Sequence, residues 1–205
     1  MSEKESPLRI AGISGSLRAG SYTRRAVEAA LAGAAESGAQ TRLIDLNGYN
    51  LIFRAGQDET GYPSDVARLR AEIKQADGII LGTPEYHGSL SGVLKNALDL
   101  MGFDEFEGKM IGLVGVSGGQ MGAFDALNTL RNIGRALHAW VIPEQASIPE
   151  AWKVFTEDGK IADPKLEKRL KDVGRQVARF AQLHKCEDAL NFVRKWEEAP
   201  SNPGA

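Results

Sequence analysis

Cysteine is nearly absent from this chain of 205 residues, which contains one, Cys186. One cysteine excludes an internal disulfide framework and any metal site built from several cysteines. The three histidines, at positions 87, 138 and 184, are too scattered to suggest a zinc cluster. We therefore expect no metal ion, and we expect a reducing compartment, the cytoplasm.

A long apolar run and an excess of charge of one sign are also missing. No apolar stretch approaches the roughly 20 residues that span a bilayer, so we expect no membrane insertion. Basic and acidic residues number 25 and 27, which gives a formal net charge of −2. This near balance offers no electrostatic reason to expect nucleic acid as a partner. The content of 42% hydrophobic and 25% charged residues is typical of a globular protein.

What the sequence does contain is an alternation of short apolar segments with amphipathic ones. We expect strands at residues 8–14, 41–46, 78–84, 109–117 and 139–148. We expect helices at residues 23–37, 65–76, 91–101, 123–137 and 164–198. This pattern predicts an α/β fold, a three-layer sandwich around a five-stranded parallel sheet in the flavodoxin-like order 2-1-3-4-5. Pro143 indicates an edge position for the last strand.

The chain length favours one domain, because two full cores would be cramped in it. We expect this domain to cover residues 1–198. The Pro-, Gly- and Ser-rich residues 199–205 form a flexible tail in this interpretation. A break near Cys186 is an alternative to one continuous helix over residues 164–198.

Three loops of the predicted fold are unusually rich in glycine and serine. They follow the first, third and fourth strands, at residues 14–23, 83–92 and 116–124. In a sheet of this order, ligands bind beyond the carboxyl ends of the strands, where the strand order reverses. The three loops therefore converge on one predicted crevice.

The first loop has the features of a phosphate site. Arg18 supplies a forked cation, and the following helix directs free N–H groups and its positive dipole end at an anion. The loop also supplies four hydroxyls, from Ser14, Ser16, Ser21 and Thr23. The alternative is that Ser21 or Thr23 merely caps the helix and Arg18 is a solvated surface residue. The loop lacks the Gly-Lys-Ser/Thr ending of triphosphate loops and does not fit G-x-G-x-x-G, so it suggests a monophosphate.

The other two loops suit a flat ring. Residues 84–89, Pro-Glu-Tyr-His-Gly-Ser, can direct backbone N–H groups at a planar heterocycle while Tyr86 or His87 packs on its face. Alternatively, Tyr86 is a packing residue and His87 a solvated one. In the third loop, Gly118, Gly119 and Gly122 allow a ligand to approach the backbone closely, or form an ordinary flexible turn.

Two motifs carry a resemblance to a known family. "GSLRAGSYT" at residues 15–23 and "PEYHGSLSGVLKNALDL" at residues 84–100 resemble the NADPH-dependent FMN reductases, which include quinone, chromate and azo-dye reductases. The family patterns are G-S-L-R-x-x-S-x-N/T and P-E-Y-N-G-S-x-P-G-x-L-K-N-A-x-D. The resemblance extends from about Ile10 to Ile148. His87 stands where the family usually has Asn, and Ser91 where it usually has Pro.

The resemblance implies a set of cofactor-binding residues for noncovalently bound FMN. The phosphate end would lie on Ser14, Ser16, Arg18, Ser21, Tyr22 and Thr23. The ring would lie on Pro84, Glu85, Tyr86 and His87, with Ser117, Gly118, Gly119 and Gln120 closing the other side. It further implies NADPH as hydride donor, a small-molecule electron acceptor, a ping-pong scheme, and a homodimer or homotetramer. The flavin supplies the chemistry, so we assign no catalytic side chain.

Two other functions fit parts of the sequence. Residues 115–119 match the G-x-S-x-G nucleophile elbow of serine hydrolases, with Ser117 as nucleophile and Asp163 or Asp172 and His184 following in hydrolase order. A flavodoxin-type electron carrier would bind FMN without turning over substrate. Such carriers are typically strongly acidic, which a net charge of −2 does not match.

Overall fold

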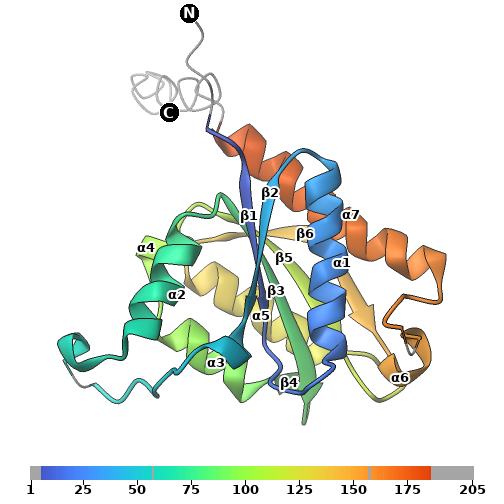
Figure 1. The fold of residues 1–205 in the computed structure, drawn as a ribbon, viewed down its shortest axis with the longest axis horizontal. Helices are drawn as coiled ribbons and strands as arrows, with labels where there is room; N and C mark the ends of the chain where they lie inside the picture. The colour runs from blue at the N-terminus through green and yellow to red at the C-terminus, as the bar shows by residue number, and fades with distance from the viewer. Residues whose placement is uncertain (1–5, 57, 157, 186–205) are drawn as a thin grey trace, which may run out of the picture.

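A parallel sheet of five strands forms the middle of the molecule (Figure 1). The computed structural model describes residues 6–56, 58–156 and 158–185. The parallel strands are β1 (Arg9–Ser14), β2 (Gln40–Asp45), β3 (Gly78–Tyr86), β5 (Met110–Val116) and β6 (Trp140–Ile148). Their order in space is β2-β1-β3-β5-β6. Counted along the chain without the short β4, this is the predicted order 2-1-3-4-5.

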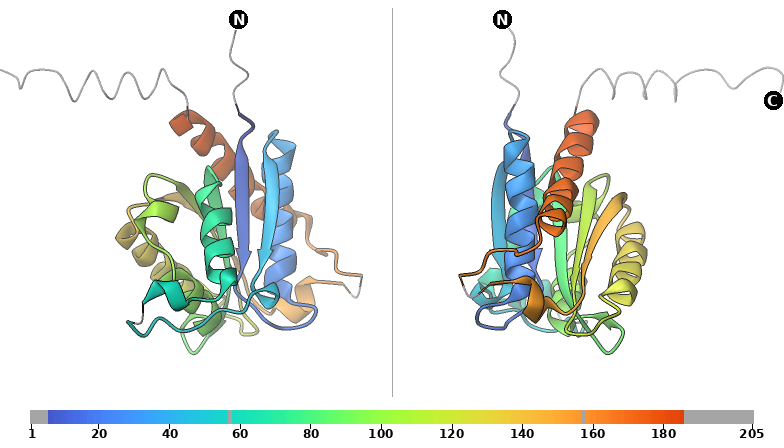
Figure 2. Two further views of the ribbon diagram at one scale, coloured as in Figure 1. Left: turned by 60° about the vertical axis from the view of Figure 1, so that its left-hand side comes forward. Right: turned by 90° about the vertical axis from the view of Figure 1, so that its right-hand side faces the viewer.

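Helices cover both faces of the sheet, as Figure 2 shows. One face carries α1 (Tyr22–Glu36) and α7 (Pro164–Lys185), and the other carries α2 (Ser64–Lys74), α3 (Gly92–Asp99) and α5 (Phe124–Ala136). The shorter helices are α4 (Phe103–Phe106), α6 (Ala151–Val154), η1 (Leu46–Gly48) and η2 (Glu59–Gly61). The predicted three-layer α/β class is therefore confirmed. Within the described ranges, none of the helices has both the length and the apolar character needed to cross a bilayer.

The third strand differs from its prediction. It continues to Tyr86, beyond the expected end at Pro84, and then turns back into β4 (Ser89–Leu90). This strand of two residues pairs antiparallel with the end of β3. The segment expected to be a simple loop is therefore a hairpin.

The edge position of β6 is confirmed, and Pro143 lies where the pairing is irregular. Ile111 of β5 is opposite Val141, whereas Leu113 is opposite Gln145. The extra residues on β6 form a bulge, in which a residue without an N–H is tolerated. Pro143 therefore lies on an edge strand of the sheet, as the sequence predicts.

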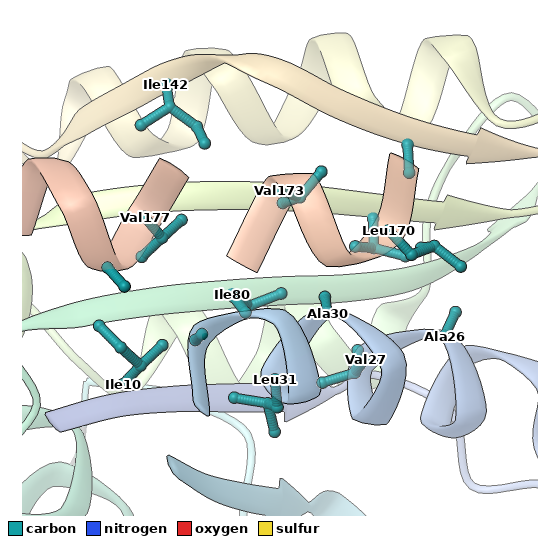
Figure 3. Packing of buried hydrophobic residues seen from close by; sticks show 14 of the residues in the cluster. Ile10, Ala26, Val27, Ala30, Leu31, Ile80, Ile142, Leu170, Val173 and Val177 are labelled. Carbon is teal, nitrogen blue, oxygen red and sulfur yellow. The ribbon is translucent and has the colours of Figure 1, made fainter. Parts of the chain in front are cut away.

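The face between the sheet and α1 and α7 holds one of two apolar core clusters (Figure 3). Val27 of α1 packs where Gly12 and Gly82 leave room on neighbouring strands, because a Cβ on Gly82 would lie 2.1 Å from Val27 Cγ2. Gly112 makes similar room for Val177 of α7. The helices therefore lie close to the sheet, and α1 is held firmly beside the end of β1.

The C-terminal region agrees with the sequence as far as it is described. Residues Phe155 and Ile161 form an antiparallel bridge around the predicted turn at residues 158–159. Helix α7 then begins at Pro164, as expected, and is described to Lys185. Its expected continuation to residue 198, the alternative break near Cys186 and the tail 199–205 lie outside the described residues.

Candidate functional site

The loop between β1 and α1 presents hydroxyls and amides at the carboxyl ends of the sheet's strands. The N–H of Gly15 donates to the carbonyl of Gly82 at 2.8 Å, which fixes the start of the loop against β3. Ser21 caps α1, because its Oγ accepts from the N–H of Arg24 at 3.2 Å. Ser21 therefore caps the helix, as the sequence allows, and its hydroxyl hydrogen is still available to donate to a ligand. The amides of the first helical turn still point outward from the helix end, since they have no partner within it.

Two groups in this loop fit a phosphate monoester. In the described ranges no carboxylate pairs with Arg18, which is exposed. Ser14 is fully buried at the end of β1, and its Oγ has no hydrogen-bond partner among the described residues. A buried hydroxyl left unpaired is costly unless a ligand or water completes it. A free guanidinium, an unpaired hydroxyl and a helix N-terminus together form a donor set that matches an anion.

The hairpin between β3 and β4 turns through His87 and Gly88. Their φ values are 52° and 74°, and they connect the paired residues Tyr86 and Ser89. A two-residue hairpin with both central residues at positive φ is a type I′ turn, for which Asn-Gly is the favoured sequence. The Asn usual in the resembling family is therefore explained by backbone conformation. Histidine adopts the same region less readily, although better than most residues.

The substitution His87→Asn is expected to stabilise the fold, because asparagine tolerates this left-handed conformation at lower cost. We expect a gain of up to about 1 kcal/mol in the free energy of unfolding. That gain corresponds to a rise of about 2–4 °C in Tm for a chain of this size. Differential scanning calorimetry measures it. His87→Ala is the control and should lower Tm; equal or lower stability of His87→Asn would contradict the assignment of the turn.

Glu85 links this hairpin to α5. Its Oε2 accepts from the N–H of Ala126 at 3.0 Å, in the first turn of a helix whose cap residue Ala123 has no side-chain acceptor. The carboxylate also interacts favourably with the positive end of the helix dipole. Glu85 therefore holds the hairpin in place, in addition to lining the pocket described below.

Ser91 joins three segments at the base of the site. Its Oγ donates to the carbonyl of Gly15 at 2.6 Å and accepts from the N–H of Leu94 at 3.1 Å, so it caps α3. Its own N–H donates to Thr83 Oγ1 at 3.0 Å. Proline, usual at this position in the resembling family, would supply neither the N–H nor the hydroxyl. In this chain a serine connects the phosphate-type loop to β3 and α3.

Replacing Ser91 by alanine should destabilise the protein by about 2 kcal/mol, because a helix cap is lost and the carbonyl of Gly15 is left buried without its donor. We expect a fall of about 4–8 °C in Tm, measured by thermal unfolding. Ser89→Ala is the matched control, since in the described ranges the Ser89 hydroxyl forms no hydrogen bond. A Ser91→Ala protein as stable as the control would disprove the linking role.

The third loop is fastened to the segment after β6. The N–H of Ser117 donates to the carbonyl of Ile148 at 2.8 Å, and the N–H of Ala151 donates back to the carbonyl of Ser117 at 3.0 Å. The Oγ of Ser117 accepts from the N–H of Gly119 at 3.0 Å, a local turn. These bonds place α6 beside the three loops.

The loops enclose a pocket of about 190 Å³ at the carboxyl ends of the strands. It is lined by Ser16, Arg18, Ser21, Tyr22, Thr23, Pro84, Glu85, Tyr86, Val116, Ser117, Gly118, Ala151 and Trp152. All the predicted site residues except Ser14, His87, Gly119 and Gln120 are in this lining. Sequence reasoning missed Val116, Ala151 and Trp152. No sequence signal marks Trp152, because tertiary hydrogen bonds of its segment bring it to the pocket.

A larger hollow of about 550 Å³ lies elsewhere, between the start of β1, the end of α1 and α7. Its lining includes Pro7, Gly38, Arg179 and Leu183. This hollow is at the amino ends of the strands, whereas the glycine- and serine-rich loops are at the carboxyl ends. Ligands of doubly wound sheets bind at the carboxyl ends, so the smaller pocket is the candidate site.

The geometry excludes the serine hydrolase. The ring of His184 lies 6.3 Å from that of Trp140, at the start of β6, and its Nδ1 contacts the carbonyl of Phe180. Ser117 follows the far end of the neighbouring strand, about 20 Å away at 3.3 Å per residue. Asp172 pairs with Lys168 and Arg175. A nucleophile, base and orienting acid are therefore not brought together.

Comparison with known proteins agrees with this geometry. The family model described as NADPH-dependent FMN reductase matches residues 8–153. The NADPH-dependent FMN reductase ArsH of Shigella flexneri is 34% identical over 182 residues, covering 86% of this chain and 70% of that protein. An NADPH azoreductase of Bacillus sp. strain OY1-2 is 32% identical over 143 residues, covering 70% of this chain and 80% of its own length.

A solved structure is also similar. The flavoenzyme FerB, an NAD(P)H:acceptor oxidoreductase of Paracoccus denitrificans, superposes with a TM-score of 0.67 at 26% identity. The match covers 86% of this chain and 98% of that one. The family match spans more than half of the chain and includes the loops after β1, β3 and β5. This chain belongs to the NADPH-dependent FMN reductase family.

Proposed function

We propose that this protein is an NAD(P)H-dependent oxidoreductase that binds FMN noncovalently in the pocket at the carboxyl ends of β1, β3 and β5. The observation that carries the proposal is the convergence of three loops on one pocket, where an anion site and an aromatic hairpin lie side by side. Family membership and the named activities of the relatives support it.

The phosphate end of FMN binds to the β1–α1 loop in this proposal. Arg18 and the hydroxyls of Ser14, Ser16, Ser21 and Thr23 would donate to its oxygens. The hairpin residues 84–87 and the loop residues 117–120 would hold the ring. The hydrogen bond from Ala126 to Glu85 keeps the hairpin rigid, so the ring position is preorganised.

When bound, FMN would supply two-electron transfer from the nicotinamide to an acceptor that takes its place, in a ping-pong scheme. The chain contributes binding and orientation, and its backbone N–H groups stabilise negative charge at the ring edge. We propose quinones, flavins, chromate and azo compounds as acceptors. The relative named as an azoreductase supports the last of these.

We further propose that residues 1–198 act as one domain, with 199–205 as a tail, and that the protein is a cytoplasmic homodimer or homotetramer. Large apolar side chains near the pocket support self-association, because Leu17, Met121 and Phe124 are 51%, 84% and 58% exposed. Large apolar side chains that stay exposed can contribute to a contact surface between subunits. The single cysteine supports a reducing compartment.

The visible spectrum of the purified protein, followed by anaerobic mixing with NADPH in a stopped-flow instrument, tests the proposed function. We expect flavin absorbance that bleaches rapidly on mixing. Stable flavin absorbance without bleaching would indicate an electron carrier instead. A protein that is colourless and does not take up added FMN would overturn the proposal.

A further inference from the structure

Trp152 is an unusually exposed aromatic side chain for one that lines a polar pocket. Its side chain is 60% exposed, and it borders the same pocket as Arg18 and Ser117. Neither the fold nor the apolar core requires a tryptophan here, because the buried side chain of α6 is Ala151. A large ring that keeps most of its surface exposed beside a pocket is available to stack on a ligand.

The segment that carries Trp152 is held firmly. The N–H of Glu150 donates to the carbonyl of Gly119 at 3.1 Å, and that of Ala151 donates to Ser117. Glu150 itself has a φ of 41°, a left-handed conformation that a non-glycine residue adopts only when its surroundings fix it. The backbone direction into α6 is therefore set by the third loop of the site.

The ammonium group of Lys153 lies over the ring of Trp152. The Nζ of Lys153 lies 4.8 Å from the centroid of Trp152 and donates to Glu150 Oε1 at 2.6 Å. Only one of the three ammonium protons is used in that bond, and the Lys153 side chain is half-exposed. Beside the pocket, the exposed ring of Trp152 therefore lies next to an ammonium group that is paired with Glu150 and keeps protons for a further acceptor.

From this pairing we infer that Trp152 and Lys153 form the subsite for the adenosine 2′-phosphate end of NADPH, the ring stacking on adenine and the ammonium binding the 2′-phosphate. The inference rests on the proposed function. Every base has a flat face that stacks on an aromatic side chain. NADPH differs from NADH by the 2′-phosphate alone, so a cation at this end discriminates between them. The phosphate of FMN already has a separate cation, Arg18, in the β1–α1 loop.

Lys153→Gln tests the charge. We expect the ratio of kcat/KM for NADPH to that for NADH to fall about tenfold, the effect of losing one charge-assisted hydrogen bond, with the NADH value unchanged. Lys160→Gln is the matched control, since Lys160 pairs with Asp158 on a nearby turn. Binding of adenosine 2′,5′-bisphosphate to the FMN-loaded protein, measured by calorimetry against 5′-AMP, should weaken equally in Lys153→Gln and not in the control.

Trp152→Ala and Trp152→Phe test the ring. The alanine variant should bind both adenosine 2′,5′-bisphosphate and 5′-AMP about tenfold more weakly, whereas phenylalanine should retain most of the affinity. Trp140 lies at the amino end of β6, at the other end of the strands from the pocket, so Trp140→Ala should change the affinity for neither nucleotide. Unchanged nucleotide ratios in Lys153→Gln, or a loss of FMN rather than nucleotide in Trp152→Ala, would overturn the inference. Absence of FMN from the unaltered protein would instead count against the proposed function.

Discussion

Changing Ser16 and Arg18 together to alanine is expected to release FMN and to abolish NADPH-dependent turnover while the protein remains folded. Each side chain would contribute a hydrogen bond to a charged phosphate, worth about 1.5–3 kcal/mol. Losing both weakens FMN binding by about 100-fold or more, at 1.4 kcal/mol per tenfold. The fold should be unaffected, because Arg18 is exposed and, among the residues that the structure describes, the Ser16 Oγ accepts only from the N–H of Arg18, at 3.4 Å.

Gel filtration followed by the ratio of flavin to protein absorbance measures this effect, and circular dichroism checks the fold. Arg24→Ala provides the matched control. It removes the same charge from the beginning of α1, but the Arg24 guanidinium pairs with Glu28 and Asp45 and does not line the pocket. The control should keep its flavin. If the double variant also stays yellow after gel filtration, the phosphate does not bind in this loop.

The fold could be predicted because its determinants are local and repeated. Periodicity separates strands from helices, and the alternation of the two leaves few topologies for a parallel sheet. Pro143 marks the edge strand by its missing N–H. The convergence of the three loops follows from the strand order alone. Each of these inferences needs only neighbouring residues or a general rule of topology.

The parts that could not be predicted depend on contacts between distant segments. The two-residue strand β4 exists because it pairs with β3, and its only local signal is the dipeptide His87–Gly88 in place of Asn-Gly. Trp152 reaches the pocket through hydrogen bonds from its segment to Ser117 and Gly119. The bond from Ser91 to Gly15 spans 76 residues of sequence, so no local pattern reports it.

The close packing of α1 and α7 leads to a second large effect, in which Gly174→Ala is expected to destabilise the protein by about 3 kcal/mol or more. A Cβ at this position would lie 1.8 Å from the carbonyl oxygen of Ala30 and 2.9 Å from the backbone N of Ala34. These are backbone atoms and cannot rotate away, so the helices would have to separate. Glycine is otherwise unfavourable inside a helix by about 1 kcal/mol relative to alanine.

Separation of these helices should also displace residues of the pocket, because the N-terminus of α1 lies beside Arg18 and Ser21. We therefore expect Gly174→Ala to lower Tm by about 6–12 °C and to reduce the retained flavin. Gly92→Ala is the control, since in the described part of the chain no atom outside the neighbouring residues and the backbone of its own helix lies within 4 Å of a Cβ at this position. The same substitution should there leave Tm unchanged or raise it slightly, because alanine is the better helix former. If the two variants unfold at the same temperature, the contact between α1 and α7 at Gly174 is not what holds α1 against the site.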